Sequence, residues 1–304
     1  MNIAQWLIPD FALIVLGHLL CRYTPMNRSV WQPVETLVYF VLFPVLLFHA
    51  TVRAPLSWSD GQFALTGVVF ALISIVSVLN LPRLSWLSRH WNAHDFAGAA
   101  QVGFRFNSFI ALAVVERVGG ASGLLLMAVL IGFCVPLYNM GAVWPMIQQG
   151  QNRGFLRELS RNPLVIATLG GLLANGLGFR FPSWIEPAVS KVGASAIPLG
   201  LMAAGAGLVW QQLGQNRILT ASLLGMRHVL APLLAYALSQ AMGLNNLQTL
   251  VLMVFSSVPT ASAAYVLASR MGFNGPYVAG LVTLSILMGL ASLGAVLMVF
   301  APTL

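Results

Sequence analysis

Long apolar stretches recur from one end of this 304-residue chain to the other, with only short polar links between them. Charged residues make up 7% of the chain, whereas a soluble domain carries about a quarter. A helix needs about 20 apolar residues to cross a bilayer, so the chain has room for roughly ten crossings. The sequence therefore predicts an all-α membrane protein embedded in the lipid bilayer and excludes a soluble globular domain.

The apolar stretches can be placed individually along the chain. The ten predicted spans are Ile3–Cys21, Val34–Val52, Phe63–Leu81, Phe96–Val115, Gly123–Ile147, Leu164–Gly178, Val189–Trp210, Ile218–Met242, Leu247–Ser269 and Pro276–Phe300. The N-terminal stretch lacks the basic start of a signal peptide, so we expect it to remain as the first span. The longest polar link, Gln148–Asn162, divides the chain into halves of five spans, residues 1–150 and 151–304, which we expect to form one intertwined transmembrane domain.

Basic residues are distributed unevenly between the two sides of the predicted membrane. Nine fall in the loops after odd-numbered spans: Arg22, Arg28, Arg83, Arg89, Arg153, Arg157, Arg161, Arg217 and Arg270. The opposite side holds four: Arg53, Arg117, Arg180 and Lys191. The positive-inside rule then places the central loop in the cytoplasm and both termini outside, in a multi-pass cell (inner) membrane protein. The net charge of +8 is thus expected to orient the chain rather than to bind nucleic acid.

The two halves share landmarks at a nearly constant offset. Three pairs are 153 residues apart: Trp31 with Trp184, Arg117 with Arg270, and Gly119 with Gly272. Two proline pairs are 154 apart: Pro33 with Pro187, and Pro44 with Pro198. Because each half has an odd number of spans, the second half must enter the membrane upside down. The pattern predicts an inverted repeat, and such repeats place a substrate site at their interface near the midplane.

The ninth span contains a helix breaker among small polar residues, in the stretch SSVPTASAAYVLASRMG from Ser256 to Gly272. Pro259 cannot donate a backbone hydrogen bond, and the carbonyls it frees need partners in protein or water. The sequence predicts a broken helix here, although a simple proline kink packed against a neighbour would give the same pattern. At the 153-residue offset, Asn107 corresponds to Thr260 and Phe106 to Pro259. We therefore expect spans four and nine to be equivalent, broken and crossed, with the first break resting on Gly103 and Asn107.

Polar residues in span four suggest a binding site. An arginine within the membrane costs about 3 kcal/mol or more, and Arg105 could grip a carboxylate there with two parallel hydrogen bonds. Alternatively, Arg105 could lie near the cytoplasmic end and reach the headgroups. Asn107 is deeper, and its amide could donate to an anion or satisfy the broken backbone. The predicted substrate-binding set is Asn107, Arg105, Ser108, Pro259, Thr260 and Arg227.

Two further charged or titratable residues lie about ten residues inside span eight, judged by its predicted bounds. Arg227 and His228 could attract an anion or relay a proton, or Arg227 could pair with Asp10 or Glu35 to hold helices together. The candidates for coupling transport to protons or sodium are Asp10, Glu35 and His228.

Enzyme signatures are missing from the sequence. It contains no HExxH, CxxC, P-loop or nucleophile-elbow motif, and Cys21 and Cys134 lack metal-ligand spacing. We therefore expect no enzymatic activity, no metal and no cofactor. Without an ATPase motif, any pumping has to use an ion or substrate gradient.

Three segments carry a family resemblance: FRFNSFIALAV from Phe104, NPLVIATLGGLLANGLG from Asn162, and VPTASAAYVLASRMG from Val258. Over nearly the whole chain the sequence resembles the auxin efflux carrier family, whose bacterial members are described as malonate- or malate-type transporters or permeases. The resemblance implies two inverted five-helix repeats, similar to the bile-acid symporter architecture. It also implies a scaffold and a mobile core in which spans four and nine cross and support the substrate carboxylate. Asn107 matches the family's polar residue at the first crossover and Pro259 its proline at the second, while Phe106 replaces the first proline.

These inferences converge on a secondary active transporter of small organic anions, such as auxin-like or dicarboxylate acids, working by alternating access. The scaffold is expected to include spans one, two, six and seven. Their glycines could permit close helix packing or form a homodimer contact: Gly170, Gly171, Gly176, Gly200, Gly205 and Gly207. The alternatives are a non-transporting membrane sensor and a cation/proton antiporter. The antiporter needs paired carboxylates deep in the membrane, which the sequence does not offer.

Overall fold

The computed structural model describes residues 3–53, 58–149, 163–208, 216–261 and 263–301, and every regular element within them is a helix. The predicted all-α class is confirmed for this part of the chain. Six described stretches are long and apolar enough to cross a membrane: Arg28–Val52, Gly61–Arg83, Ala93–Gln149, Glu186–Ala206, Arg217–Ala241 and Gly275–Phe300. The stretch of 57 residues, Ala93–Gln149, covers two of the predicted spans. The central link lies outside the described residues from position 150, and so does the predicted boundary between the halves.

The first half contains the helices α1 (Ile3–Tyr23), α2 (Arg28–Leu37), α3 (Phe43–Val52), α4 (Trp58–Leu79), α5 (Ser85–Ser88), α6 (Ala93–Ala99) and α7 (Ser108–Gln149). A π-helical turn, η1 (Val38–Leu42), joins α2 to α3, and the 3₁₀ turns are η2 (Leu81–Arg83) and η3 (Ala100–Gly103). Within α7 the backbone turns at Gly120, which adopts φ 56° and ψ −148°. A positive φ favours glycine, so Gly120 divides α7 into two stretches that correspond to the end of predicted span four and to span five.

The second half contains α9 (Pro163–Gly176), α10 (Glu186–Ala194), α11 (Ala196–Ala206), α12 (Arg217–Gly225), α13 (Ala231–Ala241), α14 (Asn246–Ser257), α15 (Ala264–Arg270) and α16 (Gly275–Phe300). A second π-helical turn, η4 (Met226–Leu230), joins α12 to α13. A capping box of Asn245 and Gln248 begins α14, and Pro259 follows just beyond its end. Predicted span nine is therefore two short helices with residues 258–263 between them.

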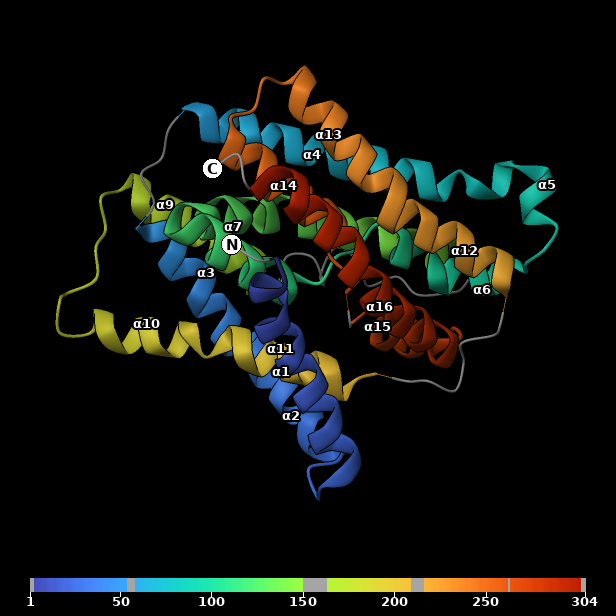
Figure 1. The fold of residues 1–304 in the computed structure, drawn as a ribbon, viewed down its shortest axis with the longest axis horizontal. Helices are drawn as coiled ribbons and strands as arrows, with labels where there is room; N and C mark the ends of the chain where they lie inside the picture. The colour runs from blue at the N-terminus through green and yellow to red at the C-terminus, as the bar shows by residue number, and fades with distance from the viewer. Residues whose placement is uncertain (1–2, 54–57, 150–162, 209–215, 262, 302–304) are drawn as a thin grey trace.

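The helices pack in two groups. In the scaffold group, α1 packs on α11, and α3 packs on α9 and α10. In the core group, α14 packs on α7, α13 and α16, while α15 packs on α16. Figure 1 shows α1, α2 and α11 together in the lower part of the view, while α4 and α13 run along the top. Each scaffold contact joins a helix of the first half to a helix of the second.

Glycines allow the scaffold helices to approach backbone to backbone. A Cβ atom at Gly205 would lie 1.7 Å from the carbonyl oxygen of Ile14, and one at Gly17 would lie 1.9 Å from that of Met202. On the other pair, a Cβ at Gly171 would lie 1.9 Å from the hydroxyl of Thr51. Glycine is the one residue that fits such distances. The sequence left two expectations for these glycines, close helix packing or a homodimer contact. Gly171 and Gly205 provide close packing within the chain.

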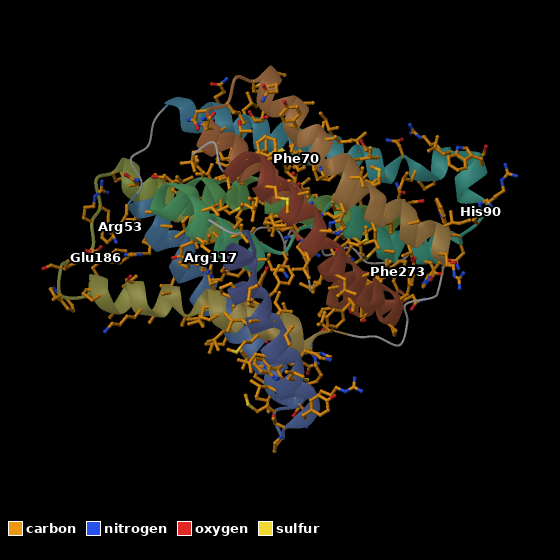
Figure 2. All side chains as sticks on the ribbon, viewed as in Figure 1. Arg53, Phe70, His90, Arg117, Glu186 and Phe273 are labelled. Carbon is orange, nitrogen blue, oxygen red and sulfur yellow. The ribbon has the colours of Figure 1, made fainter. Side chains whose placement is uncertain are left out.

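Polar contacts tie the ends of helices within each group. In the core group, the Asp95 carboxylate accepts hydrogen bonds from Asn216 Nδ2 (2.7 Å) and Asn274 Nδ2 (3.1 Å), which joins the starts of α6, α12 and α16. In the scaffold group, Arg53 Nη1 lies 3.2 Å from Glu186 Oε1 (Figure 2). This ion pair joins the end of α3 to the start of α10.

Candidate functional site

The two helix interruptions lie in contact. Between η3 and α7, residues 104–107 belong to no helix, although the sequence has no proline there. The backbone N–H of Asn107 donates to the carbonyl oxygen of Pro259 at 2.7 Å. The predicted site residues Arg105, Asn107, Pro259 and Thr260 are thus brought together where the two breaks meet.

Asn107 creates the first break by capping the helix that follows it. Its Oδ1 accepts from the backbone N–H groups of Phe109 (3.0 Å) and Ile110 (3.2 Å), so it is the N-cap of α7. The side chain is buried, at 2% exposure, and Ser108 begins the helix beside it. An N-cap replaces the proline that the family has at this point, because it satisfies the free N–H groups of a new helix start. The positive end of the α7 dipole therefore points at the crossing.

Arg105 lies in the first break and remains partly exposed. Its Nη1 donates to Gln101 Oε1 at 2.8 Å, and the guanidinium interacts electrostatically with Tyr39 on η1. Gln101 in turn donates to the carbonyl oxygens of Gly98 and Ala264, each at 3.0 Å, which fixes it between the two broken helices. Within the described residues, Gln101 is the one hydrogen-bond acceptor of this guanidinium. Most of its five N–H donors are consequently available to a ligand.

Arg227 is fully buried and serves the second break. In an unbroken helix the N–H of residue 259 would reach the carbonyl of Phe255, but proline has no N–H. Arg227 Nη2 donates to that carbonyl at 2.9 Å, and its Nε and Nη2 donate to the carbonyl of Val258 at 2.9 and 2.6 Å. The guanidinium thus replaces the missing backbone donors. Its Nη1 has no hydrogen-bond partner among the described residues.

His228 belongs to a hydrogen-bond network that holds the same break. Its Nδ1 lies 2.9 Å from Ser292 Oγ and its Nε2 lies 2.8 Å from Ser285 Oγ. Ser292 Oγ donates to the carbonyl of Ser257 (2.9 Å), and Ser285 Oγ accepts from the backbone N–H of Thr260 (2.9 Å). His228 is therefore linked, through Ser285 and Ser292, to the backbone on both sides of the second break.

Helix α16 contributes residues that the sequence reading missed. Besides Ser285 and Ser292, Gly289 receives the ring of Pro259, because a Cβ atom there would lie 2.4 Å from Pro259 Cγ. These three positions are spaced by four and three residues, so they occupy one face of a helix. That spacing of small residues in an otherwise apolar span was a signal available in the sequence. Gln101 was also absent from the predicted binding set, although it is a polar residue of span four one helical turn before Arg105.

The coupling candidates are not gathered at the crossing. Glu35 lies on α2, where Arg28 Nη1 is 2.9 Å from its Oε1. Asp10 lies on α1, and its side chain is outside the described residues. Of the three candidates, His228 is the one whose contacts reach a break. Among the described side chains, no group of three or more His, Cys, Asp or Glu residues is placed to hold a metal ion.

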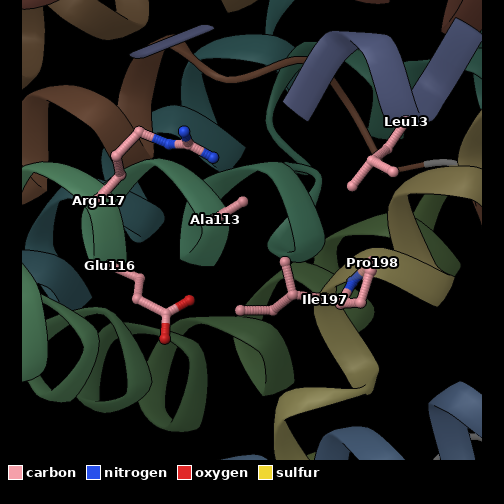
Figure 3. Close-up of a pocket in the computed structure, with 6 residues that line it drawn as sticks. All are labelled: Leu13, Ala113, Glu116, Arg117, Ile197 and Pro198. Carbon is pink, nitrogen blue, oxygen red and sulfur yellow. The ribbon is translucent and has the colours of Figure 1, made fainter. Parts of the chain in front are cut away.

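A cavity of about 360 Å³ lies between α1, α7 and α11. Its lining comes from α1, α7 and α11: Leu13, Ala113, Glu116, Arg117, Ile197 and Pro198 (Figure 3). The cavity lies between the scaffold group and the first stretch of α7. Glu116, the carboxylate in its wall, was not among the predicted site residues, although it follows span four directly.

A chain with long apolar helices, in which two interrupted helices meet at their breaks, has the arrangement of a membrane transporter. Comparison with known proteins agrees with this class. Residues 150–297 match the family described as "Membrane transport protein". The chain is also 25% identical over 256 residues to a protein of Rhizobium meliloti (strain 1021) named "Putative malonate transporter", covering 77% of this chain and 76% of that protein. The resemblance to the auxin efflux carrier family is confirmed, and the class is that of a transporter.

Proposed function

We propose that the protein is a secondary active transporter of small organic anions, and of short dicarboxylates in particular, in the cell (inner) membrane. The observation that carries the proposal is the state of Arg105. This guanidinium lies in a helix break, is partly exposed, and has one acceptor, Gln101, among the described residues. A planar fork of free N–H donors matches a carboxylate in two parallel hydrogen bonds. The name of the rhizobial relative points to the same chemical class.

The substrate site in this proposal is the meeting point of the two breaks. The start of α7 presents its positive dipole end there, next to Arg105, Ser108 and Thr260. Arg227 adds charge from behind the second break without having to touch the substrate. Burial favours the anion over a cation, because the buried polar side chains of the described residues include two histidines and one arginine but no carboxylate. The same observation disfavours a cation/proton antiporter.

Alternating access in this proposal is a movement of the core group against the scaffold group, in two inverted five-helix repeats. The packing supports an inverted repeat, since α1 pairs with α11 in the second half and α9 pairs with α3 in the first. Each pair joins the first predicted span of one repeat to the second predicted span of the other, as a two-fold relation between the repeats requires. The core group and the scaffold group meet at Phe109 on α7, whose ring centroid lies 4.9 Å from that of Phe43 on α3.

His228 is the coupling group that we favour. Arg227 is the charged side chain it interacts with, so a proton on His228 places two like charges side by side. An anion at the crossing offsets that repulsion, so anion and proton bind more favourably together than apart. The proposal therefore expects proton-coupled symport, with Asp10 and Glu35 as lesser candidates and sodium as the competing coupling ion.

Flux in proteoliposomes tests the proposed function. Radiolabelled malonate and longer dicarboxylates would be offered under an imposed pH or sodium gradient. We expect saturable uptake that Arg105→Gln lowers at least tenfold, because a charge-assisted bidentate contact is lost. Arg89→Gln, on the exposed link before α6, is the matched control and should leave uptake unchanged. Absence of uptake for every organic acid, with sodium-driven proton flux instead, would contradict the proposal.

A further inference from the structure

A polar contact connects the two groups of helices away from the crossing. Arg28 and Glu35 on α2 form an ion pair, with Nη1 2.9 Å from Oε1 and Nη2 3.4 Å from Oε2. Arg28 Nη2 also donates to the hydroxyl of Tyr265 on α15, and the guanidinium carbon lies 5.9 Å from the centroid of that ring. The ion pair thus stays within the scaffold group, and one tyrosine of the core group is held against it.

The crossing has two sides, which the packing of the half-helices defines. Gln101 of η3 donates to the carbonyl of Ala264, so α6 and η3 lie beside α15. A Cβ atom at Gly119 would lie 3.0 Å from Leu247, so the first stretch of α7 ends beside the start of α14. The contact between Arg28 and Tyr265 belongs to the side of α15.

The opposite side contains a cavity. There, the cavity of about 360 Å³ separates Leu13 of α1 and Pro198 of α11 from Ala113 of α7 (Figure 3). The same two groups of helices are therefore bridged by polar side chains on the α15 side and leave a cavity between them on the α7 side.

We propose that Arg28, Glu35 and Tyr265 form a gate that closes the α15 side of the transporter while the α7 side is accessible. Glu35 orients the guanidinium, and the bond to Tyr265 is the one that breaks when the core moves. The ion pair survives that movement, so the scaffold keeps no unpaired charge in either state. The inference rests on the proposed function, because a gate has a role only in a protein that alternates between two accessible states.

Cysteine labelling tests the gate without requiring transport. Leu13→Cys is placed in the cavity wall, in a background of Cys21→Ser and Cys134→Ala, and the protein is held in nanodiscs where both faces meet a maleimide reagent. Tyr265→Phe removes the hydroxyl and keeps the ring. We expect it to lower the labelling rate at position 13 about tenfold, because a lost hydrogen bond to a charged group shifts the population toward the state with the cavity closed. Arg28→Gln should shift the rate in the same direction.

Tyr236→Phe is the matched control, since Tyr236 lies on α13 and packs on Phe300 far from α2. It should leave labelling unchanged. An unchanged or faster labelling rate in a folded Tyr265→Phe protein overturns the gate. Failure of the proposed function is distinguishable, because labelling would then respond to Tyr265→Phe while no organic anion is carried. Anion flux without a labelling response refutes the gate alone.

Discussion

Arg105 and Arg227 have different hydrogen-bond partners at the crossing, although both are arginines within predicted spans. The Nε and Nη2 atoms of Arg227 donate hydrogen bonds to the carbonyls of Val258 and Phe255, at the break that Pro259 causes. Arg105 donates one hydrogen bond, to Gln101, among the described residues, so most of its N–H groups remain available. Neither arginine is paired with a described carboxylate. One arginine therefore supports the second break, and the other is the one that we propose to bind substrate at the first.

Replacement of Arg227 should reduce stability before it affects substrate affinity. Arg227→Gln leaves the carbonyls of Phe255 and Val258 buried without their donors, at a cost of about 3 kcal/mol. We expect a clearly lower Tm in detergent, measured by thermal unfolding with a thiol-reactive dye. Arg105→Gln is the comparison, with little change in Tm but loss of the dicarboxylate-induced rise. Equal Tm values for the two variants would show that Arg227 does not support the break.

The sequence predicted the residues of the crossing more completely than their roles. Asn107, Pro259 and Arg105 follow from local rules, because a proline or a cap residue in an apolar span has a direct backbone consequence. The partners of Arg227 could not be predicted in this way, because they are backbone carbonyls, which every residue has. The residue types suggested a carboxylate partner, Asp10 or Glu35, whereas the acceptors are backbone carbonyls at the end of α14, those of Phe255 and Val258.

At the scale of elements, glycines determine how close the helices come. Gly205 lets α11 touch the backbone of α1, and Gly289 lets α16 accept the ring of Pro259. The approximate positions of the helices were predictable from hydropathy. The turn at Gly120 separates the stretches of α7 that correspond to spans four and five, and it lies in the short predicted link between them. The pairing of distant helices depends on contacts that hydropathy does not encode.

Addition of one methyl group at Gly205 should separate two helices. Gly205→Ala places a Cβ 1.7 Å from a backbone oxygen that cannot move alone, so we expect destabilisation of about 1–3 kcal/mol. Gly225→Ala is the matched control, because nothing lies within 4 Å of its Cβ position and alanine favours a helix. Thermal unfolding of both variants checks the prediction. Similar Tm values would mean that α1 and α11 do not pack this closely.

At the scale of the whole molecule, the two groups of helices meet mainly along α7, which packs on α1, α3, α9 and α11. Gly200 on α11 faces the ring of Phe109 on α7, where a Cβ atom would lie 2.4 Å from Cδ1. Gly200 therefore lies at the contact between the two groups of helices, the surface along which the proposed mechanism moves one group against the other. The predicted positions of the termini outside and of the central loop in the cytoplasm remain predictions from the loop charges.

Gly200→Ala should impair movement more than folding. The added methyl meets a side chain that can turn, so the expected loss of stability is about 1 kcal/mol, whereas the rate of transport should fall several-fold. Initial rates in proteoliposomes, set beside Tm and substrate affinity, separate the two effects. A variant with a full transport rate would place the moving surface elsewhere.

The way in which the charge of Arg227 is solvated affects which ions can approach the crossing. Carbonyl dipoles solvate its charge but do not cancel it, and among the described residues no acid is buried near it. In a medium of low polarity, an uncancelled positive charge acts well beyond its hydrogen-bond partners. The membrane interior around the crossing should therefore hold a standing positive potential, which repels metal cations and amines before any atom of theirs reaches Arg105.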